Sequence, residues 1–144
     1  MYQRFQEEGR DLGFVVNDFE SDILLEIEQI KNGGKGHYLS PSLYLPPLKA
    51  WHKVFGKDQI RVYFAENLND STRAKAVLQD IQNYLGLPIF DFEDVLKKRF
   101  NVAPKAKMNI EIQKKLSAFF KIPNQELAAY LGKVLPDTWN NSLT

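Results

Sequence analysis

The sequence predicts a mostly α-helical fold with one or two β-strands. Apolar residues recur at helical spacing in about six segments, which open at capping residues or prolines and close at glycines or prolines. The segment from Ile60 to Ala65 is instead rich in β-branched and aromatic residues and lies between turn formers, which is typical of a buried strand. No other segment offers this strand a convincing partner. We therefore expect part of a larger α/β unit whose central sheet is incomplete.

The composition favours a single folded domain spanning residues 1–144. The chain is 44% hydrophobic and its formal net charge is +1, so we expect attraction neither to nucleic acid nor to a membrane surface. It has no cysteine and two histidines, which excludes disulfides and disfavours a metal centre. No apolar run is long enough to span a bilayer, and the first residues do not resemble a secretory signal. If Met1 is the true start, a cytoplasmic location is expected.

The first predicted helix begins at Asn17 or Asp18 and ends at Gly33. Glu20 is placed for a capping box, and the glutamates that follow fall on polar positions. Its apolar face consists of Phe19, Ile23, Ile27 and Ile30. The preceding triplet at residues 14–16, Phe-Val-Val, is a second, very short strand candidate.

The loop at residues 33–41 contains Gly-Gly-Lys-Gly, which superficially resembles a phosphate cradle. A Walker-type loop also needs a preceding strand, a following helix and Lys-Ser or Lys-Thr, and this loop has none of them. A flexible connector is the favoured interpretation.

Two helices flank the predicted strand. The first opens with Pro46 and Pro47 and ends at Gly56, and its apolar face consists of Leu48, Trp51, Val54 and Phe55. The second is capped by Asp70 or Ser71 and ends at Gly86, with Ala74, Val77, Leu78, Ile81, Tyr84 and Leu85 expected to face inward.

The C-terminal third is predicted to be helical as well. Residues 90–100 form a short helix, and residues 101–108 form a proline-containing loop. Asn109 caps the next helix, Pro123 opens the last one, and Gly132 lies near its end.

Several side chains could carry chemistry. Glu66 follows the predicted strand, where functional side chains of α/β sheets lie, but a capping or pairing role is favoured. His52 is expected to be solvated on the polar side of its helix, and His37 lies in a loop. Tyr44, Trp51 and Trp139 are expected to be core aromatics, with Tyr44 also a candidate to line a cleft. No catalytic triad or paired-carboxylate spacing is present.

The strongest candidate binding site is a basic group with no acid interleaved. It comprises Lys97, Lys98, Arg99, Lys105 and Lys107. A proline-constrained loop could direct these cations at phosphate or sulfate, with the arginine giving bidentate contacts. A solvated basic patch is an equally weighted interpretation.

Soft motifs in a consistent order resemble the second half of the sulfotransferase domain, in the form found in heparan sulfate and related carbohydrate sulfotransferases and their bacterial relatives. The matching residues are Tyr44, Trp51 and Phe55; Gln59-Ile60 and Val62; Glu66 and Leu68; Tyr84-Leu85-Gly86-Leu87-Pro88; Leu116 and Phe119-Phe120; Pro123-Asn124 and Glu126-Leu127; and Leu131-Gly132, Pro136 and Trp139. The resemblance spans roughly residues 38–139.

This resemblance implies the C-terminal portion of an α/β P-loop fold. It also implies transfer of a sulfuryl group from 3′-phosphoadenosine 5′-phosphosulfate (PAPS) to a hydroxyl or amine, on a carbohydrate acceptor. The family's 5′-phosphosulfate loop, its Arg and Ser for the 3′-phosphate and its usual base are not found in these residues. Of the family's PAPS-binding parts, the resemblance leaves only the basic loop, with Lys98, Arg99, Lys105 and Lys107 as candidate PAPS contacts. No metal is implied. The chain alone is therefore expected to be inactive.

The alternative is a non-catalytic helical interaction module. It would self-associate through the unpaired strand from Ile60 to Ala65. A further alternative is an anion-binding remnant that uses the basic loop.

Overall fold

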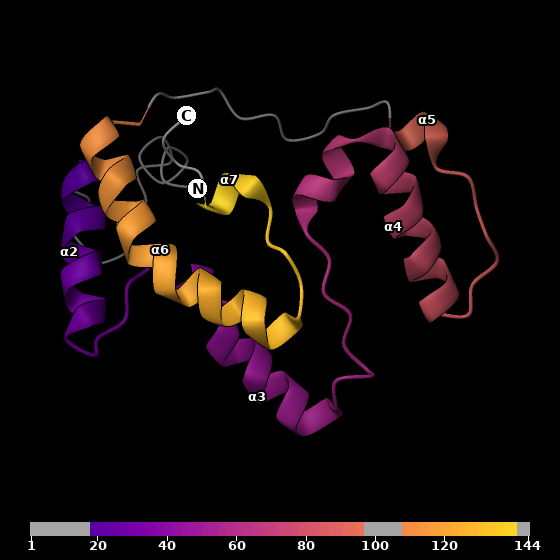
Figure 1. Cartoon of the computed structure of the whole chain (residues 1–144), viewed down its shortest axis with the longest axis horizontal. Coiled ribbons are helices and arrows are strands. Elements are labelled where there is room, and N and C mark those ends of the chain that lie inside the picture. The colour runs from indigo at the N-terminus through magenta and orange to yellow at the C-terminus, as the bar shows by residue number, and fades with distance from the viewer. Residues whose placement is uncertain (1–17, 97–107, 141–144) are drawn as a thin grey trace, which may run out of the picture.

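The structure, a computed structural model, describes residues 18–96 and 108–140, and they are mostly helical. The α-helices are α2 (Phe19–Lys31), α3 (Leu45–Phe55), α4 (Ser71–Tyr84), α5 (Glu93–Leu96), α6 (Ile110–Leu131) and α7 (Asp137–Asn140), joined by two 3₁₀ helices, η1 (Ser40–Ser42) and η2 (Ala65–Asn69). In Figure 1, α2, α3, α6 and α7 form one body, and α4 and α5 form an arm beside it. The residues at 14–16 lie outside the described part.

The helix ends follow the local sequence. The Asp18 carboxylate accepts from the backbone N–H and the hydroxyl of Ser21, at 3.0 and 2.6 Å, and caps α2. These hydrogen bonds lower the pKa of Asp18. With Asp18 as the cap, Glu20 lies one position too early for a capping box, and instead it accepts a hydrogen bond from the Asn109 side chain at 3.3 Å. Asp70 and Asn109 cap α4 and α6 as predicted.

The two helices predicted on either side of Pro123 are one helix, α6, and the prediction of a new helix at Pro123 is wrong. Pro123 lies inside α6, which continues to Leu131 and ends at Gly132 in the left-handed conformation (φ 62°). Proline lacks the backbone N–H and its ring crowds the carbonyl four residues earlier, which bends a helix without always ending it. Figure 1 shows α6 changing direction along its length, so that its first half lies against α2 and its second half against α3.

Two small apolar cores lie along α6. The first joins α2, the loop after it and the first half of α6 through Ile23, Ile27, Leu39 and Ile112. The second joins the start of α3, the end of α6 and the segment before α7 through Leu45, Leu127 and Leu135. The predicted inward face of α2 is therefore confirmed for Ile23 and Ile27, which are buried.

The predicted strand is not a strand in the structure. Residues 60–64 run without helical turns between α3 and η2, and Phe64 has extended backbone angles (φ −94°, ψ 128°). A strand needs a ladder of hydrogen bonds to a neighbour, and the described residues contain no strand to pair with. The expectation of one or two strands is thus wrong for this part of the chain, while the mostly helical prediction is confirmed.

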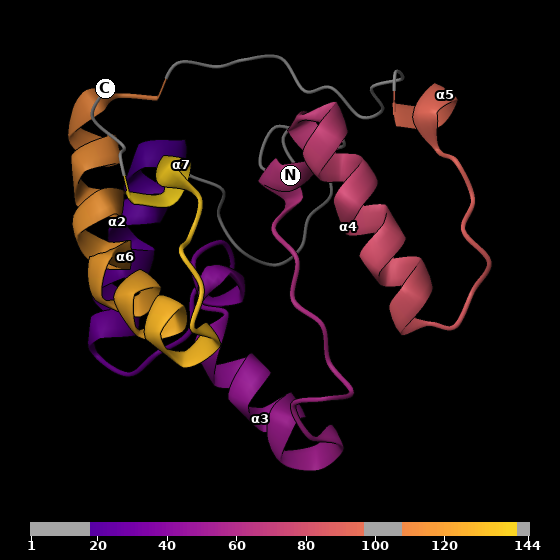
Figure 2. The same ribbon diagram turned by 45° about the vertical axis from the view of Figure 1, so that its right-hand side comes forward.

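The arm consists of α4, α5 and the segment between them. The buried Gln82 side chain fixes this segment by accepting from the N–H of Phe90 at 2.5 Å and donating to the carbonyl of Leu78 at 3.1 Å. Only part of the predicted inward face of α4 is covered: Ala74 is fully buried, whereas Tyr84 and Leu85 are exposed. Figure 2 shows the arm and the body as separate layers joined by the segment after α3.

Candidate functional site

An open groove of about 830 Å³ lies between α3, the segment at residues 60–66, α6 and α7. Its walls are mainly apolar and aromatic, with a few polar groups. The residues that line it include Tyr44, Leu48, Trp51, Ile60, Val62, Phe64, Glu66, Phe120, Asn124, Leu127, Leu131 and Trp139. Such a groove, with few polar groups among apolar ones, is the usual form of a binding site.

Trp139 is the centre of this groove. Its ring stacks on Tyr44 and meets the edge of Phe64, with both pairs of ring centroids 5.7 Å apart. Its indole N–H donates to Glu66 Oε1 at 2.6 Å, and its carbonyl accepts from the Asn124 side chain at 3.2 Å. Glu66 therefore ties η2 to α7, which agrees with the favoured pairing role.

The other predicted core aromatics are largely exposed. Trp51 is 60% exposed and Tyr44 is 48% exposed, so the expectation that they lie in the core is wrong, whereas Tyr44 does line the groove. Val54 and Phe55, which continue the apolar face of α3, are 73% and 49% exposed. The amphipathic pattern of α3 predicted an inward face, but only its start at Leu45 is buried.

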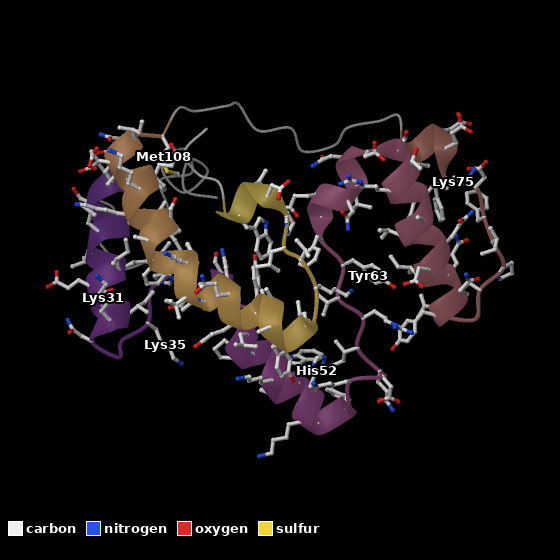
Figure 3. All side chains as sticks on the ribbon, viewed as in Figure 1. Lys31, Lys35, His52, Tyr63, Lys75 and Met108 are labelled. Carbon is white, nitrogen blue, oxygen red and sulfur yellow. The ribbon has the colours of Figure 1, made fainter. Side chains whose placement is uncertain are left out.

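Arg61 and Tyr63 point away from the groove and contact α4. The Tyr63 hydroxyl donates to Asp80 Oδ2 at 2.6 Å, and the Arg61 guanidinium lies 4.8 Å from the centre of the Tyr84 ring. Figure 3 shows Tyr63 extending from its segment toward α4. The hydrogen bond to Asp80 is the main cause that raises the pKa of Tyr63.

His52 is half-buried against α6, so the expectation of a solvated histidine is wrong (Figure 3). Its Nδ1 lies 2.9 Å from the Tyr130 hydroxyl, and the two rings stack at 5.6 Å. The Nζ atoms of Lys49 and Lys57 lie 5.5 and 4.5 Å from the centre of the Tyr130 ring. His52 thus helps to hold α3 on α6.

The glycine-rich loop does cradle an anion, but the anion belongs to the chain itself. Glu26 is only 7% exposed, and its carboxylate accepts from the backbone N–H groups of His37, Tyr38 and Leu39 at 2.6 to 3.0 Å. A Cβ on Gly36 would overlap this carboxylate. The loop is therefore a connector whose backbone is held by Glu26, and the expectation that the glutamates of this helix fall on its polar side is wrong for Glu26.

No predicted PAPS contact can be placed, because Lys98, Arg99, Lys105 and Lys107 lie outside the described residues. Residues 18–96 and 108–140 contain no group of three or more His, Asp or Glu side chains that could hold a metal ion. Within the same ranges, no helix has the length and apolar character needed to cross a bilayer.

The chain was compared with protein-family models, with curated proteins and with solved structures. None of the three comparisons gave a match.

Proposed function

We propose that this chain is the C-terminal portion of a PAPS-dependent sulfotransferase domain. The complete domain would transfer a sulfuryl group from PAPS to a hydroxyl or amine of a carbohydrate acceptor. The 5′-phosphosulfate loop and the catalytic base would come from outside these 144 residues. The chain alone would then have no sulfuryl-transfer activity.

The observation that carries this proposal is the meeting of the motif residues around Trp139. Tyr44, Glu66, Asn124 and Trp139 come from four separate parts of the sequence resemblance, and three of these residues contact the fourth directly. Residues spread over nearly the whole described chain therefore meet at one place in the fold. The convergence supports one shared fold behind the resemblance.

The open groove and the unpaired segment at residues 60–64 also support the proposal. In an α/β fold, helices such as α3 and α6 cover a sheet, and a central strand has neighbours on both edges. Here α3 exposes Trp51 and Val54, and the segment has no strand beside it in the described part of the chain. A sheet-bearing portion of the domain would cover both.

The loop after α2 does not offer its backbone amides to the phosphate groups of PAPS. The amide cradle at His37, Tyr38 and Leu39 is filled by Glu26 and so is not open to a nucleotide. The resemblance gives, by position, Lys98, Arg99, Lys105 and Lys107 as the proposed PAPS contacts, whose cationic side chains would neutralise the phosphates. No metal takes part in this proposal.

Calorimetric titration with 3′-phosphoadenosine 5′-phosphate, the product nucleotide, tests these contacts. We expect weak binding that disappears when Lys98, Arg99, Lys105 and Lys107 are all replaced by alanine. The matched control replaces four other cations, Lys31 of α2 and Lys114, Lys115 and Lys121 of α6, and should keep the affinity. Absence of heat with the unaltered chain, or equal loss in both variants, would overturn the proposed site.

A transfer assay with PAPS and a glycosaminoglycan tests the other half of the proposal. The chain alone should give no sulfated product, whereas a chimera that supplies a carbohydrate sulfotransferase's first half upstream should restore transfer. Sulfuryl transfer by the isolated chain would contradict the proposal that the 5′-phosphosulfate loop and the catalytic base come from outside these residues. A folded chimera that binds PAPS but never transfers would contradict the family assignment.

A further inference from the structure

The groove around Trp139 holds a single charged side chain. Of the described residues that line it, only Glu66 carries a charge at neutral pH, and the other polar side chains bear hydroxyls, indoles and the amide of Asn124. The remaining walls are apolar or aromatic. A cleft that presents charge of one sign between apolar walls attracts ligands of the opposite sign. The groove therefore favours a cation with an apolar body.

The Glu66 carboxylate has acceptor capacity left for such a ligand. Its Oε1 accepts from the Trp139 indole N–H at 2.6 Å, whereas a carboxylate offers about four acceptor positions over its two oxygens. Within the described ranges, no lysine or arginine forms an ion pair with Glu66. Arg73 and Lys133 line a neighbouring cavity that also reaches Glu66, but the Lys133 ammonium donates to the carbonyl of Val62 at 2.9 Å. The negative charge of Glu66 is thus not neutralised by a contacting cation of the described chain.

Aromatic rings lie beside this carboxylate. Trp139, which donates to Glu66, stacks on Tyr44 and meets the edge of Phe64. Tyr44 and Trp51 also line the groove and are 48% and 60% exposed, so a ligand can reach their rings. Aromatic faces attract organic cations through the ring quadrupole, and tryptophan does so most strongly. One place in the fold therefore offers both a carboxylate for an ammonium group and rings for the body that carries it.

We propose that this groove binds a small organic ammonium ion, a primary amine on an aromatic or alkyl body. The ammonium group donates to the Glu66 carboxylate, and the body packs against Tyr44, Trp51 and the apolar walls. The groove volume of about 830 Å³ lies within the range of small-molecule sites, about 300–1,000 Å³. This inference does not depend on the sulfotransferase proposal.

Titration with three compounds that share one aromatic body tests the charge preference. Phenethylamine is a cation at neutral pH, phenethyl alcohol is neutral and phenylacetate is an anion. The amine should bind about tenfold more tightly than the alcohol, because an ionised donor makes a hydrogen bond roughly twice as strong as a neutral one, and phenylacetate should bind most weakly.

NMR chemical shifts locate the binding of each compound. Trp51 and Trp139 are the two tryptophans of the chain and both line the groove, so their indole N–H signals report binding there. The signals of α2, which contributes no residue to the groove, should stay in place. Equal affinities for the amine and the alcohol, or shifts that spare both indoles, would overturn the proposal.

A pair of variants separates the Glu66 charge from the general charge of the chain. Glu66→Gln removes the charge and keeps an oxygen that can accept from Trp139, so amine binding should weaken about tenfold while alcohol binding is unchanged. Glu126→Gln removes the same charge from an exposed position of α6 outside the groove and should keep the amine affinity. Equal amine affinity of the two variants, with helix content preserved by circular dichroism, would contradict the assigned contact. If Glu66→Gln does not fold, the titration of the unaltered chain with the three compounds still decides the question.

Discussion

The two halves of α6 border regions that are packed very differently. Along its first half, α2 and the following loop enclose a core in which Ile23 and Ile112 are 2% and 3% exposed. Along its second half, α3 leaves Trp51 and Val54 60% and 73% exposed over the open groove. Both regions have amphipathic sequences, so the difference lies in whether a covering partner is present. The closed region is covered by the chain itself, and the open region leaves the apolar face of α3 exposed.

Two glutamates, one in each region, differ in the same way in their burial and hydrogen bonding. In the closed region, Glu26 is buried and accepts from three backbone amides, so its carboxylate is fully committed. In the open region, Glu66 is half-buried and accepts from one indole N–H. We therefore expect the free energy of unfolding to depend far more on Glu26 than on Glu66.

Replacement of Glu26 by alanine should give the largest effect. It removes the charged acceptor of three backbone N–H groups, those of His37, Tyr38 and Leu39, and a hydrogen bond to a charged group contributes about 1.5–3 kcal/mol, so the free energy of unfolding should fall by at least about 3 kcal/mol. Urea denaturation followed by circular dichroism measures this change. Glu28→Ala, at an exposed position of the same helix, is the control. Equal midpoints for the two variants would show that the amide cradle does not stabilise the fold.

Truncation of apolar side chains compares the two regions directly. Ile23→Ala removes a 2%-exposed side chain and should lower the free energy of unfolding by about 2–5 kcal/mol. Val54→Ala removes a 73%-exposed one and should change it by less than about 0.5 kcal/mol. Thermal and urea unfolding in dilute solution measure both. A large loss in Val54→Ala would mean that the α3 face is already covered.

Gly36→Ala tests the close approach of the loop backbone to the Glu26 carboxylate. A Cβ at this position would overlap the Glu26 carboxylate, and the strain should destabilise the fold by about 1–3 kcal/mol. In a Glu26→Ala background the same substitution should have a smaller effect, because the carboxylate is gone and only the Cβ of residue 26, 3.1 Å away, remains. The double-mutant cycle therefore yields a coupling energy, and a value near zero would contradict the contact.

Glu66→Ala should have a smaller effect, about 1 kcal/mol, because a single part-buried hydrogen bond is lost. A Trp51→Phe background makes Trp139 the only tryptophan, so its fluorescence reports this site. We expect a shift in Trp139 emission and a lower urea midpoint. An unchanged spectrum would show that the Glu66 contact is absent in solution.

The smallest expected effect on stability comes from the hydrogen bond of the Tyr63 hydroxyl. Its hydrogen bond to Asp80 raises the pKa of the phenol above the ordinary value of 10.0. A raised folded-state pKa adds stability that is present below pH 10 and is lost as the pH rises through the folded-state pKa. NMR titration of Tyr63 should therefore give a higher pKa than in an Asp80→Ala variant. Identical titration curves would show that the hydrogen bond between Tyr63 and Asp80 of the arm is absent in solution.

Local sequence signals predicted most of the helical fold. Capping by Asp18, Asp70 and Asn109 needs only neighbouring residues, and these predictions are confirmed. The break expected at Pro123 is wrong because packing on both sides of α6 outweighs one missing hydrogen bond. The strand at residues 60–65 failed for the opposite reason, because its propensity is correct but its ladder partner is not in the described chain.

The site was harder to predict, because its contacts join residues far apart in the sequence. Glu26 reaches amides 11 to 13 residues later, and Glu66 reaches an indole 73 residues later. The glycine-rich loop after α2 was the available signal for the Glu26 cradle, but nothing in it indicates an internal anion. The exposure of Trp51 depends on a missing cover, which no pattern within α3 can reveal.

Amide hydrogen exchange in dilute solution tests the contrast between the two regions most directly. The amides of His37, Tyr38 and Leu39 donate to Glu26, so they should exchange slowly, near the rate set by global unfolding. The amides of Arg61 and Tyr63 have no acceptor in the described chain and should exchange close to the unfolded rate. Equal protection of both groups in the monomer would contradict the account of one closed and one open region.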